Sequence, residues 1–266
     1  MNLHLKTAVN SARLAGDLII SNLGKLSKSD VSSKQASDYV TRIDRSAEEI
    51  IINMIRKNFP NHIIHAEESG KDAGTGEYRW IIDPLDGTTN YIHGYPQFSV
   101  SIGLEHKGEM ILGAILDPLR DELFTATKGR GAFLNNNPLC VSRVTTLEES
   151  LLSTGFPFRN KEMIGPYLDL FRSLFNRISD MRRAGSAALD LAYVAAGRCD
   201  GFFEIGLSPW DIAAGSILIK EAGGIISDFS GGSDYLISGN VVAGNPLVHT
   251  GILKEVREIF KKIIDR

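Results

Sequence analysis

Acidic side chains follow short apolar runs at three places in the chain. Glu67 and Glu68 come after "HIIHA", Asp83 and Asp86 lie within "WIIDPLDG", and Asp211 lies within "SPWDIAAG". Strand ends can hold side chains rigidly toward a cleft, so we expect these acids to line one site. Carboxylates without a neighbouring His or Cys are typical ligands of a hard cation, which favours Mg²⁺ over Zn²⁺.

Pro84 separates Asp83 from Asp86 in this stretch. A proline fixes its own φ and cannot donate a ladder hydrogen bond, so we expect the strand to stop and the chain to turn there. The two carboxylates would then face one point, with the carbonyl oxygen of Leu85 between them. Two carboxylates and a carbonyl suit the oxygen coordination that Mg²⁺ prefers.

Gly87, Thr88, Thr89 and Asn90 directly follow the second aspartate. The glycine allows close approach to the backbone, and threonine hydroxyls with N–H groups at the start of a short helix form a phosphate-binding loop. Metal ligands followed at once by an anion site indicate metal-assisted phosphoryl chemistry, because the metal offsets the charges of the acids and of the phosphate.

Each acidic segment also has a simpler structural explanation. "DPLDG" is a common turn sequence, the Glu67–Glu68 pair is compatible with a solvated surface turn, and Asp211 is compatible with a helix cap. The presence of these segments in one chain, together with a glycine-threonine loop, favours the metal-site interpretation.

Hydrophobic periodicity predicts the elements that must position these acids. Short apolar runs at 62–66 and 78–83 are expected strands, and a meander of hairpins at 98–141 predicts an antiparallel sheet. Beyond about residue 150, short strands alternate with helices. The polar, serine-rich segment 25–38 is expected to be a mobile loop. Helices are predicted at 3–23, from Asp44 or Ser46 to Asn58, and at 161–178, 186–197, 210–222 and 246–265.

Composition limits the protein class and its surroundings. The 266 residues are expected to form one domain with two packed halves, about 1–150 and 151–266. With 43% hydrophobic residues and a net charge of −3, the chain has no global attraction for nucleic acid or anionic membranes. The N-terminal segment is typical of an amphipathic helix rather than a signal peptide, and no run suits a bilayer span. The expected compartment is the cytoplasm.

Two long segments, "WIIDPLDGTTNYIHGYPQFSVSIGL" and "WDIAAGSILIKEAGG", resemble the signatures of the inositol monophosphatase family. The resemblance extends from the N-terminal helix to "GNVVAGNP". It implies an α+β fold, a layered α-β-α-β-α sandwich with an antiparallel meander sheet in the first half and mixed α/β structure in the second. It also implies a homodimeric, lithium-sensitive, Mg²⁺-dependent phosphomonoesterase that hydrolyses inositol monophosphate or a related sugar phosphate.

The resemblance also implies roles for individual residues. Asp83 would bridge two Mg²⁺ ions, Glu67 would help to hold a weaker third ion near the loop residue Lys34, and Asp44 with Thr88 would polarise the attacking water. The implied metal ligands are Glu67, Asp83, the carbonyl of Leu85, Asp86 and Asp211, and Glu67 also counts as catalytic. The implied substrate contacts are Asp86, Gly87, Thr88, Arg183, Gly185, Ser186, Ala187, Glu204 and Asp211.

Some questions stay open at this level. Arg182 and Arg183 flank the expected sugar loop, and either substrate binding or a subunit interface would explain them. A nucleotide 3′-phosphatase (3′-phosphoadenosine phosphatase) or a fructose-bisphosphatase of the same superfamily is an alternative activity. One bacterial branch of the family joins the Nus-type antitermination machinery, so the resemblance also implies association with Nus factors and RNA polymerase in ribosomal RNA synthesis. Nothing in the composition supports that second role.

Overall fold

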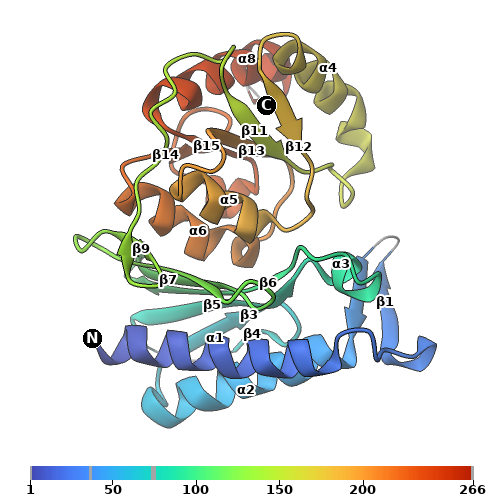
Figure 1. The fold of residues 1–266 in the computed structure, drawn as a ribbon, viewed down its shortest axis with the longest axis vertical. Coiled ribbons are helices and arrows are strands. Elements are labelled where there is room, and N and C mark those ends of the chain that lie inside the picture. The colour runs from blue at the N-terminus through green and yellow to red at the C-terminus, as the bar shows by residue number, and fades with distance from the viewer. Residues whose placement is uncertain (1, 36–37, 73–75, 265–266) are drawn as a thin grey trace.

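The computed structural model describes residues 2–35, 38–72 and 76–264, and Figure 1 shows helices and sheets in alternating layers. An outer pair of helices, an eight-stranded sheet, an inner pair of helices, a five-stranded sheet and a second outer pair follow one another. These layers confirm the predicted α-β-α-β-α fold. The helices are, in this order, α1 (Leu3–Asn22) and α2 (Arg42–Asn58), α5 (Ala187–Ala195) and α6 (Pro209–Glu221), and α4 (Ile164–Phe175) and α8 (Pro246–Ile264).

The eight-stranded sheet of the described ranges contains the predicted meander. From β5 to β10 each strand pairs antiparallel with the next, while β3 runs parallel to β5. The strand order is β10-β9-β8-β7-β6-β5-β3-β4. The strands are β3 (Ile63–Ala66), β4 (Gly70–Lys71), β5 (Tyr78–Asp86), β6 (Ser99–His106), β7 (Glu109–Asp117), β8 (Glu122–Thr127), β9 (Ala132–Leu134) and β10 (Asn137–Pro138).

The five-stranded sheet of the same described ranges is mixed, as predicted for the second half. Strand β11 runs parallel to β12 and β13, while β15 runs antiparallel to β13 and β14. Neither β12 nor the short helix α7 (Tyr235–Ser238) was predicted, because segments of three or four residues show no periodicity. In sheet order the strands are β12 (Asp180–Arg182), β11 (Leu151–Thr154), β13 (Gly201–Glu204), β15 (Val241–Gly244) and β14 (Ile225–Ser227).

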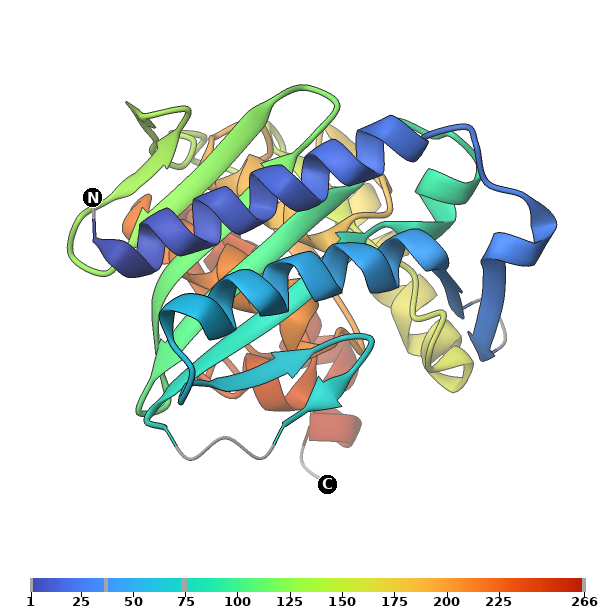
Figure 2. The ribbon, with the colours of Figure 1, turned by 90° about the horizontal axis from the view of Figure 1, so that it is seen from below.

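Helices α1 and α2 lie side by side across one face of the eight-stranded sheet (Figure 2). Their small and branched side chains, such as Ala12, Ile19 and Ile51, are fully buried against the sheet. Helix α2 begins at Arg42, earlier than predicted, because Thr41 caps it: the Thr41 Oγ1 accepts hydrogen bonds from the N–H groups of the first turn. Asp44 therefore lies inside the first turn of α2.

Helix α6 lies between the two sheets and is buried on nearly all sides. It packs unusually close to the larger sheet, because a Cβ on Gly113 of β7 would lie only 2.5 Å from the carbonyl oxygen of Ala214. Glycine at this position lets the helix backbone touch the strand. The start of α6, which carries Asp211, is thereby placed next to the end of β5.

The prediction of a loop at 25–38 was wrong for its described residues. Strands β1 (Val31–Gln35) and β2 (Asp38–Thr41) pair antiparallel, with Val31 opposite Thr41, after a 3₁₀ turn at Lys28–Asp30. The serine-rich composition hid these strands because they pair only with each other and bury few apolar side chains. Residues 36–37 of the predicted loop lie outside the described residues.

None of the helices in the described ranges combines the length and the apolar character that a membrane span needs.

Candidate metal and phosphate site

Asp83 and Asp86 lie on β5 with a bulge between them. Asp83 pairs with Ser101 and Asp86 with Ser99, so three steps on β5 match two steps on β6. Side chains alternate between faces along a regular strand, so residues three apart would point to opposite faces, and the extra residue of the bulge returns them to one face.

The predicted strand stop at Pro84 was therefore wrong, since β5 continues to Asp86. Two features let the strand carry a proline. The pairing of β5 with β3 ends at Ile82, so no β3 carbonyl needs a donor from Pro84. The bulge also removes one residue from the ladder with β6.

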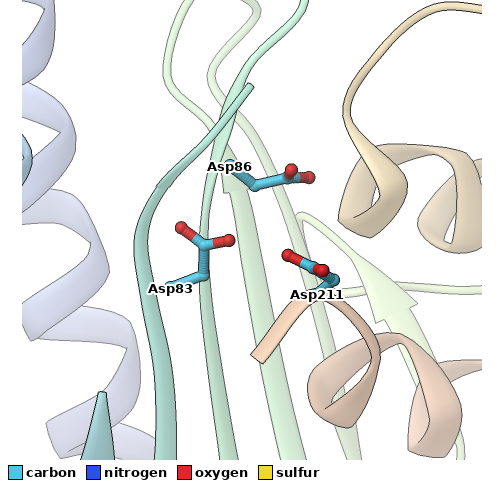
Figure 3. A group of neighbouring side chains, drawn as sticks. All are labelled: Asp83, Asp86 and Asp211. Atoms are coloured by element: carbon cyan, nitrogen blue, oxygen red, sulfur yellow. The ribbon is translucent and has the colours of Figure 1, made fainter. Parts of the chain in front are cut away.

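Asp211 completes a cluster with these two aspartates (Figure 3). One carboxylate oxygen of each residue lies within 4.8 Å of the other two, and the residues are only 1%, 9% and 4% exposed in chain order. Asp211 is not the N-cap of α6, which is Ser208, but the third residue of the helix. Its Oδ2 accepts a hydrogen bond of 2.7 Å from the N–H of Ser208, and this capping box is compatible with a role as a metal ligand.

Hydrogen bonds orient each carboxylate of the cluster. The Asp83 Oδ1 accepts from the N–H of Leu85 at 3.0 Å. The Asp86 Oδ2 accepts from the Ser186 Oγ at 2.6 Å and from the N–H of Ala188 at 2.8 Å. A carboxylate has about four acceptor positions, so each group keeps capacity for a cation. Fixed ligands of this kind are typical of prepared metal sites.

Burial and mutual repulsion raise the pKa values of two carboxyl groups in the cluster. Burial, with the nearby charges of Glu67, Asp86 and Asp211, raises the pKa of Asp83 well above its usual range. Burial and the charge of Asp211 raise the pKa of Asp86 to about 7. Glu67 follows β3, and its N–H donates to the Ile82 carbonyl at 3.1 Å. Hard oxygen donors that cannot all ionise without a counter-charge fit a Mg²⁺ site.

Asp44 and Thr88 form a hydrogen-bonded pair beside the cluster. The Thr88 Oγ1 donates to the Asp44 Oδ1 at 2.8 Å, and it lies 3.1 Å from the Leu85 carbonyl oxygen. The Thr41 hydroxyl and N–H donate to the other oxygen of Asp44, at 2.5 and 2.9 Å. Burial nevertheless raises the pKa of Asp44. The pair joins α2 to the start of α3 (Thr88–Ile92).

Gly87 precedes α3 with φ +94°, a conformation that side chains disfavour. A Cβ at this position would lie 2.8 Å from the Gln97 carbonyl oxygen and 3.3 Å from that of Gly185. The predicted glycine-threonine loop therefore lies directly against the predicted sugar loop. Asn90 links the two loops by hydrogen bonds, because its Nδ2 donates to the carbonyl oxygens of Gln97 and Ala184 at 2.7 and 3.0 Å.

A cavity of about 400 Å³ brings most of the predicted site residues together. Asp44 and Glu68 do not line the cavity. Asp44 is buried behind Thr88, and the N–H of Glu68 donates a hydrogen bond to the Glu48 Oε2, which fits the surface-turn interpretation of that residue. The side chain of Lys34 lies outside the described part of the structure. The predicted residues that line the cavity are Glu67, Asp83, Leu85, Asp86, Gly87, Thr88, Arg183, Gly185, Ser186, Ala187, Glu204 and Asp211.

The two arginines beside the sugar loop differ in position. Arg183 lines the cavity and lies over the ring of Phe156, 5.3 Å from its centroid. Arg182 pairs with Asp180 at 2.5 Å, with both side chains about half exposed. Of the two explanations left open above, substrate contact is therefore geometrically possible for Arg183.

Two charged residues of the cavity were not predicted from the sequence. The Arg159 Nη1 lies 3.0 Å from the Asp211 Oδ2, and its guanidinium rests 4.9 Å from the centre of the Phe158 ring. Asp190, on α5, is 2% exposed. Two sequence signals could have indicated these residues. Arg159 is a basic residue soon after the strand "SLLSTGF", and Asp190 is a single acid in an otherwise apolar helix.

We expect Arg159→Gln to destabilise the protein in EDTA by about 1–2 kcal/mol, because Asp211 loses its counter-charge in an acidic, buried cluster. Saturating Mg²⁺ should largely remove this difference by supplying the positive charge. Urea unfolding with and without Mg²⁺ measures both values. Arg159→Lys, which keeps the charge, is the matched control. An equal loss of stability in both conditions would show that Arg159 does not balance the charge of the metal ligands.

Comparison with known proteins gives the family. The sequence pattern of the inositol monophosphatase family matches residues 2–261. The Nus factor SuhB of Escherichia coli K12 is 50% identical over 263 residues, which are 98% of either chain. The structure of extragenic suppressor protein suhB from Bartonella henselae is 42% identical, with TM-score 0.93 over 96% of this chain and 99% of that one. An IMPase structure from Thermotoga maritima is 38% identical, with TM-score 0.89 over 98% and 100%. On this sequence match, and with the fold and acid cluster described above, the chain belongs to the inositol monophosphatase family.

Proposed function

We propose that this protein is a Mg²⁺-dependent phosphomonoesterase that hydrolyses inositol monophosphate or a related sugar phosphate. One observation carries the proposal: the Asp44–Thr88 pair adjoins the cluster of Asp83, Asp86 and Asp211 at one cavity. Family membership supports a phosphatase in general, and the expected sugar loop of Gly185, Ser186 and Ala187 at the cavity supports a sugar phosphate.

The chain's oxygen ligands would hold the metal. Asp83 would bridge two ions, as the family resemblance implies, and the charges of Glu67, Asp86 and Asp211 all act on its carboxyl. When bound, Mg²⁺ supplies positive charge that offsets the phosphate and makes nearby water more acidic. The proposed ligands are Glu67, Asp83, the carbonyl of Leu85, Asp86 and Asp211.

Asp44 and Thr88 would position and deprotonate the attacking water. The Asp44 Oδ1 at 2.8 Å is a nearer acceptor for the single hydroxyl proton of Thr88 than the Leu85 carbonyl oxygen at 3.1 Å, and the Thr88 oxygen would then accept a hydrogen bond from water. The backbone N–H groups of Gly87 and Thr88 would hold the phosphate for in-line attack. As the ester P–O bond breaks, the alcohol would leave toward the sugar loop of Gly185, Ser186 and Ala187 and take a proton from solvent water, without a covalent phosphoenzyme.

Asp44→Asn is expected to lower kcat for inositol 1-phosphate by about 10²-fold with little change in KM, because a neutral amide no longer accepts the proton passed through Thr88. Steady-state phosphate release measures this. Thr88→Ser, which keeps the hydroxyl, should retain most of the activity, whereas Thr88→Ala should lose as much as Asp44→Asn. Full turnover by the alanine variant would exclude the proposed proton path.

We also propose association with Nus factors and RNA polymerase in ribosomal RNA synthesis, because the 50%-identical relative is itself named a Nus factor. We propose the cytoplasm as the compartment, because both proposed roles would take place there. We expect the Asp83→Asn variant to keep binding to Nus factors and RNA polymerase, which would show that this binding does not need the active site. Immobilised wild-type and variant proteins, incubated with purified RNA polymerase and Nus factors, test this. Failure of both to retain these partners would refute the second role.

A homodimer is proposed as well. Ile164, Leu168 and Phe175 share one face of α4 and are 43%, 46% and 55% exposed, so they form an apolar stripe of the kind that dimers bury. Sedimentation at micromolar concentration should give the dimer mass, and a monomer mass would contradict the proposal.

A further inference from the structure

Helix α2 carries a second buried acid, one turn beyond Asp44. Glu48 is 3% exposed and Asp44 is 1% exposed. Residues four apart lie on the same face of a helix, so the two side chains leave α2 on one side. Asp44 has a place in the proposed mechanism through Thr88, whereas Glu48 does not line the cavity and has no role in that mechanism. The position of this buried carboxylate therefore needs another explanation.

Both carboxylate oxygens of Glu48 hold the turn that follows β3. The Glu48 Oε2 accepts a hydrogen bond of 2.8 Å from the N–H of Glu68, and its Oε1 accepts one of 2.8 Å from the N–H of Ser69. The turn joins β3 to β4, which pair with Ala66 opposite Gly70. Two parallel bonds to one carboxylate fix orientation as well as position, so α2 determines how this turn sits.

Glu67 is the first residue of the same turn and the one that reaches the cavity. Its N–H donates to the Ile82 carbonyl at 3.1 Å, so β5 holds the start of the turn while Glu48 holds the rest. The charge of Glu67 acts on Asp83, which places the two carboxyls close together. The direction of the Glu67 side chain thus depends on a backbone that Glu48 helps to fix.

Helix α2 connects this turn to the phosphate loop. The Asp44 Oδ1 accepts a hydrogen bond from the Thr88 Oγ1 at 2.8 Å, on the same side of the helix as Glu48. Four residues of an α-helix span about 6 Å along its axis. One rigid helical turn therefore sets the spacing between the proposed water-positioning pair and the turn that carries Glu67.

The two hydrogen bonds of Glu48 require a carboxylate. A glutamine offers one acceptor oxygen, and its amide NH₂ group would face the second backbone N–H, donor against donor. A buried N–H without a partner is costly, so the turn would move. Loss of a group that orients a metal ligand typically lowers metal affinity or activity by about 10- to 100-fold.

We propose that Glu48 is a positioning residue that fixes Glu67 for cation binding and holds it at a set distance from the Asp44–Thr88 pair. The inference rests on the proposed metal-dependent function and deepens it, because it assigns to the metal site a residue outside the cavity. Glu48 acts through the backbone of Glu68 and Ser69 rather than by touching metal or substrate.

Glu48→Gln tests the proposal, with Glu49→Gln as the matched control, because Glu49 is the next residue of α2 and is exposed. Calorimetric titration with Mg²⁺ and no substrate gives a dissociation constant that does not depend on activity. We expect this constant to rise about 10- to 100-fold in Glu48→Gln and to stay within about twofold of wild type in the control. At saturating Mg²⁺, kcat for inositol 1-phosphate should stay within about threefold of wild type, because the Asp44–Thr88 pair is intact.

A double-mutant cycle separates positioning from a purely structural role. Glu67→Gln should itself weaken Mg²⁺ binding, and adding Glu48→Gln should then raise the dissociation constant by less than about threefold, because the residue that Glu48 positions is already lost. Losses that multiply in the double variant overturn the inference. A lower melting temperature of Glu48→Gln with an unchanged dissociation constant also overturns it, since Glu48 would then serve only the fold.

If circular dichroism shows that Glu48→Gln does not fold, Glu48→Asp decides. Its carboxylate is one methylene group shorter and should weaken Mg²⁺ binding at least about threefold, and an unchanged dissociation constant overturns the inference. A wild-type protein that binds no Mg²⁺ would overturn the proposed metal site and this inference with it. A wild-type protein that binds Mg²⁺ but releases no phosphate from inositol 1-phosphate would overturn the proposed function alone, because the dissociation constants decide the role of Glu48.

Discussion

Replacing Asp83 with asparagine is expected to lower Mg²⁺-dependent phosphate release by at least about 10³-fold, because the proposed bridging ligand loses its charge. The same change should raise the melting temperature of the metal-free protein. Asp83 is 1% exposed, and Glu67, Asp86 and Asp211 repel its ionised form. An amide removes this repulsion without changing the shape of the side chain.

Two measurements test both halves of this prediction. Phosphate release at saturating Mg²⁺ gives the catalytic loss, and thermal unfolding in EDTA gives the gain in stability. Asp169→Asn is the matched control, because it removes an exposed acid of α4 far along the chain from the cluster. Undiminished turnover in Asp83→Asn would refute the metal-dependent mechanism, and a lower melting temperature would refute the repulsion argument.

The affinity for Mg²⁺ is expected to rise about 100-fold between pH 5 and pH 7. The pKa of Asp86 is raised to about 7 by burial and Asp211, and burial with the nearby acids raises that of Asp83 well above its usual range. Below pH 7 the cation must therefore displace at least one proton, which costs about tenfold in affinity per pH unit. Calorimetric titrations in two buffers of different ionisation enthalpy measure the affinity and the protons released.

The stability of the metal-free protein should depend on pH in the opposite direction and fall as pH rises. In the metal-free protein the raised pKa of Asp86 means that the folded state keeps a proton that the unfolded chain loses above its ordinary value of 3.8. The contribution of this group to stability therefore falls as pH rises from about 4 to 7 and is constant above that range. The increase in melting temperature caused by Mg²⁺ should accordingly be larger at pH 8 than at pH 5.5, and an increase independent of pH would contradict this linkage.

Local patterns predicted much of the fold. The spacing of apolar residues placed α1, α6 and α8, and the turn residues located the hairpins of the meander, because these signals depend on neighbours within a few positions. The strands of the serine-rich segment escaped prediction, since β1 and β2 pair only with each other. The start of α2 was predicted late because Thr41, and not an acid, provides the cap.

The site was predictable in composition but not in geometry. "DPLDG" and "SPWDIAAG" indicated an oxygen-rich cation site, while the proposed role of Glu204 came only from resemblance to a family. Pro84 favoured a turn, yet β5 continues through it, because the missing β3 partner and the β6 bulge remove the need for its N–H. That bulge is what directs Asp83 and Asp86 to the same face.

The sequence by itself therefore determined which chemical groups the chain offers and the elements that carry them. Only the tertiary structure decided which of those groups meet. Asp83 and Asp211 come from distant segments and meet Arg159 and Asp190 at one cavity, while Asp44 reaches it through Thr88. The packing of α5 and α6 between two sheets brings these segments together, and contacts between such distant positions leave no periodic signal in the chain.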